Sequence, residues 1–486
     1  MSKEFDYYAT LGIRHDASQE EIREAYSTLT LGFSPEARDA AKNNEYQRIQ
    51  NAFEVLSDPA RRETYDALIA ETSSGELQLD VVLSREKVDI SDSNQLVYLL
   101  VNLKPPKQQS GTQLPLNLSL VVDRSTSMQG NRLHNVKTAV ELLIEKLSPE
   151  DTLSIISFSD RAEVVVSADN VANKQQITAQ VRAIQASGGT EIYQGLKAGI
   201  QELRKKDLKQ HSNQLILLTD GHTYGDSKEC LDLAQNVVNE GIGISAFGIG
   251  SEWNDQFLDS LVSPSGGQSG FIEDPANIIT FLQERITGLG MLYAQNVRLK
   301  NAFPQSLNVK YGFKLVPFAQ PLNTDLAEIK LGDIESRAPL RFLLELEIEP
   351  QPTDTRINVQ LSFVATLPSQ SRNIGFKEST CIFVLEDAPR ALPPDKIVEA
   401  VRVLNMYRMN EKVWSEVEAG RIDVATSRMR HLSTRLLEAG KDELAHQANM
   451  EIEKIQHAGT MSLEGRKRLK YGTRAMFNQT IKLDDE

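Results

Sequence analysis

The chain has 486 residues, of which 40% are hydrophobic and 25% are charged, and its formal net charge is −14. That length suggests roughly three or four domains, and the negative charge argues against nonspecific binding to nucleic acid or anionic lipid. The two cysteines, Cys230 and Cys381, lie far apart in the sequence, which argues against a disulfide framework. The sequence shows no apolar signal segment and no run long enough to span a membrane. We therefore expect a cytoplasmic protein without a membrane partner.

Residues 1–70 predict a helical domain. Ser18 and Glu21 form a capping box for a helix that reaches about residue 31, and apolar spacing predicts a second helix over 44–56 and a short third piece over 61–69. The motifs D-Y-Y-x-x-L-G, A-S-x-x-E-I-x-x-A-Y and A-F-x-V-L-S-D-P-x-x-R-x-x-Y-D resemble a J-domain over residues 4–70.

The resemblance implies a co-chaperone of a DnaK-type chaperone, but the motif that carries this activity differs. Where the family has His-Pro-Asp in the loop between its two main helices, this chain has Ser34-Pro35-Glu36. The stretch 25–33 before it contains no Lys or Arg, although this helix is usually basic in the family. We therefore expect a helical domain that serves docking or structure and does not trigger ATP hydrolysis.

A cluster of oxygen-bearing side chains follows the first strongly apolar segment of the chain. Residues 116–122 predict a buried strand, and 132–147 has the apolar spacing of a helix. Between them lie Asp123, Ser125 and Ser127, at the strand end where open α/β sheets bind ligands. Hard oxygen ligands without Cys or His suit Mg²⁺, Mn²⁺ or Ca²⁺.

Two later segments add further oxygen ligands at loop positions of the same kind. Ser187-Gly188-Gly189-Thr190 precedes a helix, and the apolar run 215–219 ends in Asp220 and Gly221. Together with D-x-S-x-S, this chain order resembles the metal-ion-dependent adhesion site of von Willebrand factor A domains. The resemblance implies that a divalent cation, Mg²⁺ or alternatively Mn²⁺ or Ca²⁺, is held by Asp123, Ser125, Ser127, Thr190 and Asp220.

The segment 115–290 has the strand and helix alternation of such a domain. The pattern predicts a mostly parallel, doubly wound Rossmann-like sheet. Strands are expected at 116–122, 152–158, 162–166, 215–219, 242–247 and 270–272, and helices at 132–147, 174–185, 191–203, 227–240 and 275–286.

Strand-like segments on both sides of this domain predict a β-sandwich. They lie within 76–114 and 294–388, at 77–83, 95–103, 297–299, 307–313, 326–331, 340–348, 357–364 and 381–385. Several alternate apolar and polar residues, as antiparallel sheets do. We expect one sandwich into which the A domain is inserted, an arrangement that integrin β chains also use. The alternative is a separate downstream sandwich with 76–104 as an edge.

Residues 393–480 predict a C-terminal helical domain. The sequence E-A-G ends at Gly420 and again at Gly440, and H-A-G ends at Gly459, so each glycine is a plausible C-cap. This punctuation divides the region into three helical units, which a basic stretch over 466–474 follows. We expect a packed helical cap, since there are too few units for a solenoid.

These features predict a non-enzymatic intracellular adaptor whose metal accepts an Asp or Glu from a partner protein. His222 is the histidine nearest in sequence to the proposed ligands, but a lone loop histidine is more often a surface side chain than a catalytic base, and no phosphate-binding G-x-x-x-x-G-K motif is present. Bacterial A-domain proteins often work beside MoxR-type AAA+ ATPases or with kinases and phosphatases. The alternatives are a DnaK-type co-chaperone and an accessory subunit of a chelatase-type AAA+ ATPase.

Overall fold

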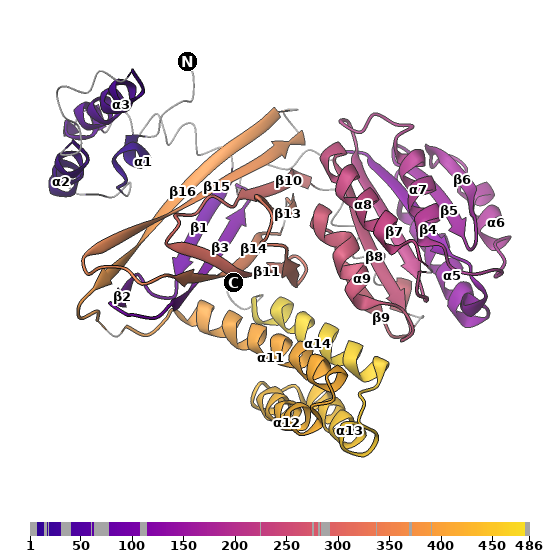
Figure 1. Ribbon diagram of the computed structural model, residues 1–486. Coiled ribbons are helices and arrows are strands. Elements are labelled where there is room, and N and C mark those ends of the chain that lie inside the picture. The colour runs from indigo at the N-terminus through magenta and orange to yellow at the C-terminus, as the bar shows by residue number, and fades with distance from the viewer. Residues whose placement is uncertain are drawn as a thin grey trace.

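The structure is a computed structural model of the 486-residue chain. It describes residues 7–13, 17, 19–30, 40–59, 61–62, 77–106, 114–223, 225–274, 277–279, 282, 292–336, 338–368, 372–389 and 391–481. Figure 1 shows an α/β domain beside a β-sandwich, with the C-terminal helices below the sandwich and a small group of helices at the N-terminus. No helix among these described residues is long and apolar enough to cross a membrane.

The α/β domain is built on a six-stranded sheet of order β6-β5-β4-β7-β8-β9. Its strands are β4 (Leu116–Asp123), β5 (Thr152–Phe158), β6 (Ala162–Asn170), β7 (Ser212–Thr219), β8 (Ile242–Ile249) and β9 (Ser269–Ile272). All neighbours pair in parallel except the edge strand β6, which is antiparallel to β5. The strands β4, β5 and β7 are buried along their whole length, as expected for strands that helices cover on both faces.

Helices cover both faces of this sheet. They are α5 (Asn131–Lys146), α6 (Lys174–Arg182), α7 (Ile192–Leu203), α8 (Ser227–Val237) and α9 (Asp255–Val262). One apolar core joins α5 and α6 to side chains such as Leu120, and the other joins α7, α8 and α9 to side chains such as Val121. At Gly195 in α7, a Cβ would lie only 2.7 Å from the Phe158 ring, so glycine permits the close approach of this helix to the sheet.

The β-sandwich is formed by chain segments from both sides of the α/β domain. One sheet has the order β1-β3-β14-β11-β12 and the other β13-β10-β15-β16-β2. The strands before the α/β domain are β1 (Gln78–Leu83), β2 (Lys87–Asp89) and β3 (Gln95–Lys104). Those after it are β10 (Leu292–Lys300), β11 (Leu307–Val316), β12 (Gln320–Leu322), β13 (Glu328–Glu335), β14 (Leu340–Ile348), β15 (Thr355–Leu367) and β16 (Arg372–Leu385). Since β3 pairs with β14, strands from both sides of the α/β domain share one sheet, in which β1 and β3 form one edge, and the α/β domain is inserted between β3 and β10.

The C-terminal helices bridge the other two domains. They are α11 (Asp395–Glu418), α12 (Ile422–Glu438), α13 (Asp442–Ala458) and α14 (Leu463–Ile481). Gly420, Gly440 and Gly459 follow α11, α12 and α13 with φ of 72°, 68° and 66°, the left-handed conformation that ends a helix. The helices share an apolar core with the sandwich, and α14 also reaches the α/β domain, where the ring centroids of Tyr471 and Trp253 are 5.9 Å apart.

The N-terminal helices form a small core of their own. They are α1 (Tyr7–Leu11), α2 (Gln19–Thr30) and α3 (Ala40–Leu56). Tyr26 of α2 stacks on Phe53 of α3 with ring centroids 4.0 Å apart. Ser34-Pro35-Glu36 lies outside the described residues, as does most of the predicted third piece over 61–69.

The predicted fold class is confirmed, and the differences concern short or polar elements. The strands β2 and β12 and the helices α1 and α9 were not predicted. The strand expected over 381–385 is only the end of β16, in which Ile374 and Phe376 are the only large apolar side chains before Cys381. Most of the helix expected over 275–286 lies outside the described residues, and the basic C-terminal stretch belongs to a fourth helix, α14.

Candidate metal site

Asp123 and Asp220 lie at the carboxyl ends of two neighbouring parallel strands. Asp123 is the last residue of β4, and Asp220 directly follows β7. From β4 the chain adds β5 and β6 on one side of the sheet and later adds β7, β8 and β9 on the other. The strand order therefore reverses between β4 and β7, and ligands of open α/β sheets bind in the crevice at such a point.

The loop after β4 is held by hydrogen bonds to these two carboxylates. The backbone N–H of Ser125 donates to Asp123 Oδ1 at 2.8 Å, and the hydroxyl of Ser127 donates to Asp220 Oδ1 at 2.7 Å. The hydroxyl oxygens of Ser125 and Ser127 are 3.0 Å apart. The two serines of the motif therefore present their oxygens side by side above the two acids.

Thr190 reaches the same place from a second loop. The backbone N–H and the hydroxyl of Thr126 both donate to the Gly188 carbonyl at 3.0 Å, which ties the two loops together. Thr190 Oγ1 would be 3.2 Å from a Cβ placed on Gly221, so Thr190 lies against the residue that follows Asp220. The structure thus brings the five predicted residues to one edge of the sheet.

Four of the five residues are buried, and one is exposed to solvent. Asp123, Ser125, Thr190 and Asp220 are at most 5% exposed, whereas Ser127 is exposed. Burial raises the pKa of Asp123 to about 6, although hydrogen bonds from Thr219 and Ser125 oppose the shift. The Thr219 hydroxyl donates to Asp123 Oδ2 at 2.7 Å.

A cation already lies beside one of the two acids. Arg132 Nη1 is 2.5 Å from Asp220 Oδ2 and 3.3 Å from the Ser127 carbonyl oxygen. The Asp220 side chain is fully buried in this pair, and that of Arg132 remains 34% exposed. Asp220 therefore uses one carboxylate oxygen for Ser127 and the other for Arg132.

Three models of known protein families match the two ends and the middle of the chain. A model of the von Willebrand factor type A domain matches residues 117–284, a DnaJ domain model matches 6–66, and a model of the Sll0103-like C-terminal alpha-helical domain matches 395–479. The chain is 31% identical over 283 residues to the uncharacterised protein Sll0103 of Synechocystis sp., an alignment that covers 56% of this chain and 67% of that protein. The chain belongs to the von Willebrand factor type A domain protein family.

Other relatives cover smaller parts of their own length. The uncharacterised protein YfbK of Escherichia coli is 23% identical over 255 residues, which are 50% of this chain but only 44% of that protein. The chaperone protein DnaJ 2 of Streptomyces coelicolor is 45% identical over 62 residues, which are 13% of this chain and 16% of that protein. The chain thus spans less than half the length of either of these relatives.

Solved structures share the fold over most of the chain. A von Willebrand factor type A protein from Catenulispora acidiphila superposes with a TM-score of 0.64 at 15% identity, and covers 82% of this chain and 97% of its own. The ArnB paralog VWA2 from Sulfolobus acidocaldarius gives a TM-score of 0.54 at 16% identity, covering 82% and 98%. These similarities support the arrangement of the A domain and its flanking domains.

The donor set of the A domain fits a small hard cation. In an octahedron with metal–oxygen bonds of about 2.1 Å, neighbouring ligand oxygens are about 3.0 Å apart. The hydroxyl oxygens of Ser125 and Ser127 have this separation, at 3.0 Å. Within the described part of the chain, no three His, Cys, Asp or Glu side chains gather to hold a metal, so a site here depends on hydroxyl ligands. Ser125, Ser127 and Thr190 would hold the ion directly, and Asp123 and Asp220 would supply its counter-charge.

His222 shows no sign of acting with this site. The residue is exposed, and the described residues include no hydrogen bond between it and the five proposed ligands. A general base must lie within hydrogen-bond reach of the group it deprotonates, directly or through one water. The geometry therefore gives no support to a catalytic His222.

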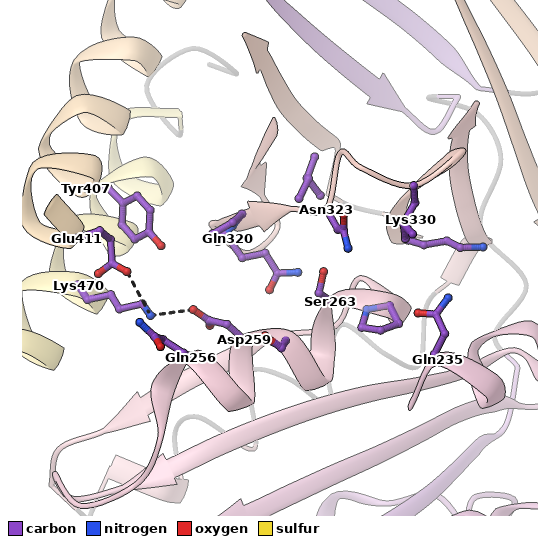
Figure 2. A pocket seen from close by; sticks show the side chains of 15 residues that line it. Gln235, Gln256, Asp259, Ser263, Gln320, Asn323, Lys330, Tyr407, Glu411 and Lys470 are labelled. Carbon is purple, nitrogen blue, oxygen red and sulfur yellow. Dashed lines mark ion pairs between the residues drawn. The ribbon is translucent and has the colours of Figure 1, made fainter. Parts of the chain in front are cut away.

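A second polar site lies where the A domain, the sandwich and the C-terminal helices meet (Figure 2). It is a cavity of about 370 Å³ whose walls include Gln320 and Tyr407. Lys470 Nζ is 2.8 Å from Asp259 Oδ2 and 3.9 Å from Glu411 Oε2. The fourth charged residue of its lining, Lys330, is 3.5 Å from Glu328. Because each charged group has a partner of opposite sign, the cavity resembles a structural junction more than an active site.

One wall of this cavity continues into a buried ion-pair cluster that fixes α14 to α9. We call it the α14 seam, and it consists of the ion-paired residues Arg466, Lys470 and Arg474 with Asp255 and Asp259. Beside them, Lys467 donates to the Trp253 carbonyl at 2.6 Å. Burial opposes ionisation of Asp259, but the charges of Arg474 and Lys470 outweigh it and hold the pKa of this carboxyl below its usual range.

Sequence reasoning missed the residues that support the proposed ligands. Asp160 accepts a hydrogen bond from the Gly189 N–H at 2.9 Å and so orients the loop that carries Thr190. The sequence contained one indication that Arg132 has a negatively charged partner. Arg132 lies in the first turn of α5, where the helix dipole disfavours a cation without a counter-charge. The α14 seam gave no such signal, because a basic helical stretch usually faces solvent.

Proposed function

We propose that this chain is an adaptor that binds partner proteins through a divalent cation in its A domain. Ser125, Ser127 and Thr190 would contribute hydroxyl ligands, with Asp123 and Asp220 behind them. The cation is Mg²⁺, or alternatively Mn²⁺ or Ca²⁺, and it accepts a carboxylate oxygen from an Asp or Glu of the partner. The observation that carries this proposal is the convergence of the five residues at the strand ends where the strand order reverses, with Ser127 exposed to solvent.

The ligand chemistry explains why such an ion would seek a partner. Neutral hydroxyls remove none of the ion's charge, and Asp220 is already paired with Arg132. The ion therefore stays under-neutralised and attracts an external carboxylate into the solvent side of its coordination shell. The partner is a protein, and the AAA+ ATPases or kinase and phosphatase systems near which bacterial A-domain proteins occur are the first to examine.

Thr190→Ala provides the test, because it deletes one proposed ligand and no charge. The truncation removes little buried apolar surface, so we expect it to cost less than about 1 kcal/mol of folding stability. The loss of an ion-mediated contact at the centre of an interface should cost about 2 kcal/mol or more of binding free energy.

The measurement compares partner capture and melting temperature for the full chain and Thr190→Ala, with and without EDTA, and Thr190→Ser serves as the control that keeps the hydroxyl. The proposal expects capture that requires the metal, is lost in Thr190→Ala and is retained in Thr190→Ser. Capture that is unchanged in both Thr190→Ala and EDTA would show that partners bind elsewhere on the chain.

A second candidate function follows from the DnaJ domain match over residues 6–66, which favours partnership with a DnaK-type chaperone. Because Ser34 and Glu36 replace the His and Asp of the family motif, we expect the full chain not to stimulate a DnaK-type ATPase. A Ser34→His/Glu36→Asp double variant is the control that restores the motif. A several-fold rise in steady-state turnover with the unaltered chain would establish the co-chaperone function instead.

A further inference from the structure

Arg132 occupies a helix position that disfavours a positive charge. It lies in the first turn of α5, where the partial positive charge of the helix end repels a cation. Its guanidinium contacts Asp220 Oδ2 at 2.5 Å and the Ser127 carbonyl at 3.3 Å, both at the metal site. A Cβ on Gly250, which follows β8, would be 3.2 Å from Arg132 Nη2, so the group is lodged between two adjacent strand ends.

Arg132 also compensates the charge of the buried Asp220 carboxylate. Asp220 is 1% exposed, and a buried carboxylate without a cation or enough hydrogen bonds is strongly unfavourable. Ser127 supplies one hydrogen bond to Oδ1, and Arg132 supplies the charge at Oδ2. A divalent ion on the serine hydroxyls would neutralise the same carboxylate, so the guanidinium and the metal serve the same group.

We propose that Arg132 is a resident cation of this site, which pairs with Asp220 when no metal is bound and lowers the affinity of the site for a divalent ion. This inference rests on the proposed function, since it concerns the regulation of the same site. A metal entering beside the guanidinium meets either its repulsion or the loss of its ion pair with Asp220. With a third of its side chain exposed, Arg132 has room to turn toward solvent when the metal enters.

Because Arg132 and the metal compete for Asp220, metal binding depends on the partner. Arg132 cancels one of the two negative charges available to the ion, so the ion gains more from a partner carboxylate than it would at a doubly acidic site. Metal and partner then strengthen each other's binding, because coupling between two ligands is reciprocal. Arg132 thereby keeps the site largely empty until an acidic partner arrives.

The experiment is a calorimetric titration of the full chain with Mn²⁺, comparing the unaltered protein with Arg132→Gln. We expect Arg132→Gln to bind Mn²⁺ about tenfold more tightly or better, because a like charge has been removed from beside the ion. Arg132→Lys keeps the charge and should stay within about threefold of the unaltered chain. Arg161→Gln is the matched control, since it removes an exposed charge from the turn between β5 and β6 at the same edge of the sheet.

Melting temperature separates this role from a purely structural one. In EDTA, Arg132→Gln should melt below the unaltered chain because Asp220 is left buried without a counter-charge, and Mn²⁺ should raise its melting temperature more than it raises that of the unaltered chain. A variant that melts lower in both conditions and binds Mn²⁺ no more tightly would overturn the inference and leave the proposed metal site standing. If neither protein binds Mn²⁺, both proposals fail, whereas binding by Arg132→Gln alone would support both.

Discussion

The edge of the A-domain sheet that carries Asp123 and Asp220, here called the metal edge, and the α14 seam both bury aspartates. The two regions balance the charge of these aspartates differently. In the seam, Asp259 contacts Arg474 Nη2 at 2.6 Å and Lys470 at 2.8 Å, so its carboxylate is surrounded by positive charge. At the metal edge, Asp123 contacts hydroxyl and backbone donors, and Asp220 alone has a cation. In the seam each aspartate therefore lies against two cations, whereas at the metal edge Asp123 has none among the described residues.

The pKa shifts show the same contrast. Burial acts on both groups, yet the pKa of Asp259 is held below its ordinary range by its cations and that of Asp123 is raised to about 6. A buried acid whose charge is satisfied stabilises the fold, while one whose charge is unsatisfied is poised to take a proton or a metal. An isosteric Asp→Asn replacement should therefore destabilise the fold in the seam and leave the stability of the metal edge nearly unchanged.

The largest effect is expected for Asp259→Asn in the seam. Without the carboxylate, Lys470 and Arg474 remain buried with too little negative charge, and breaking a buried pair in this way costs about 3–5 kcal/mol. Urea denaturation should show the loss directly. Asp232→Asn on the exposed surface of α8 is the control, and because its side chain is 63% exposed, it should change stability by less than about 0.5 kcal/mol. If Asp259→Asn and Asp232→Asn are equally stable, the ion pairs of the seam do not stabilise the docking of α14.

The second prediction concerns Asp123→Asn at the metal edge. In EDTA at pH 7 we expect its stability to lie within about 1 kcal/mol of the unaltered chain, because an amide needs no counter-charge in the buried position. Its Mg²⁺ or Mn²⁺ affinity should fall by about 30-fold or more, since the ion loses one of two nearby negative charges. Calorimetry and urea denaturation on the same preparation provide both values. Unchanged metal binding would mean that the ion does not occupy the site built on Asp123.

The elements that could be predicted from the sequence are those whose pattern is local. The strands β4 and β7 are continuous apolar runs, and Asp123, Ser125, Ser127, Thr190 and Asp220 each follow a strand or precede a helix in a recognisable order. Parallel strands bring their carboxyl ends to one edge, so convergence of these loops followed from the fold class itself.

What escaped prediction depends on contacts between distant segments. Lys470 is buried by α9, which lies more than 200 residues earlier in the chain, and nothing near Lys470 in sequence indicates its partner. Arg132 meets Asp220 because α5 packs in one core with β7 side chains such as Leu218, and spacing along the sequence does not specify that packing. The strands β2 and β12 are three residues each and owe their form to neighbouring strands rather than to their own sequence.

The smallest predicted effect is a pH dependence that belongs to the metal edge and not to the seam. Because the pKa of Asp123 is raised from 3.8 to about 6, the metal-free folded chain binds a proton that the unfolded chain has already released. The stability contributed by this group is therefore fully present below pH 3.8 and is lost as the pH rises through about 6.

Metal binding has the opposite dependence, because the ion must displace that proton. Mn²⁺ affinity should be about tenfold weaker at pH 5 than at pH 7, so the rise in melting temperature produced by Mn²⁺ should grow over this interval. Thermal melts at both pH values with Mn²⁺ and with EDTA measure the two trends together. Asp123→Asn, which has no titrating group at this position, should flatten the trend in EDTA. A metal-induced shift that is the same at pH 5 and pH 7 would show that the proton on Asp123 does not compete with the ion, and that the unsatisfied charge at this edge is balanced by another group.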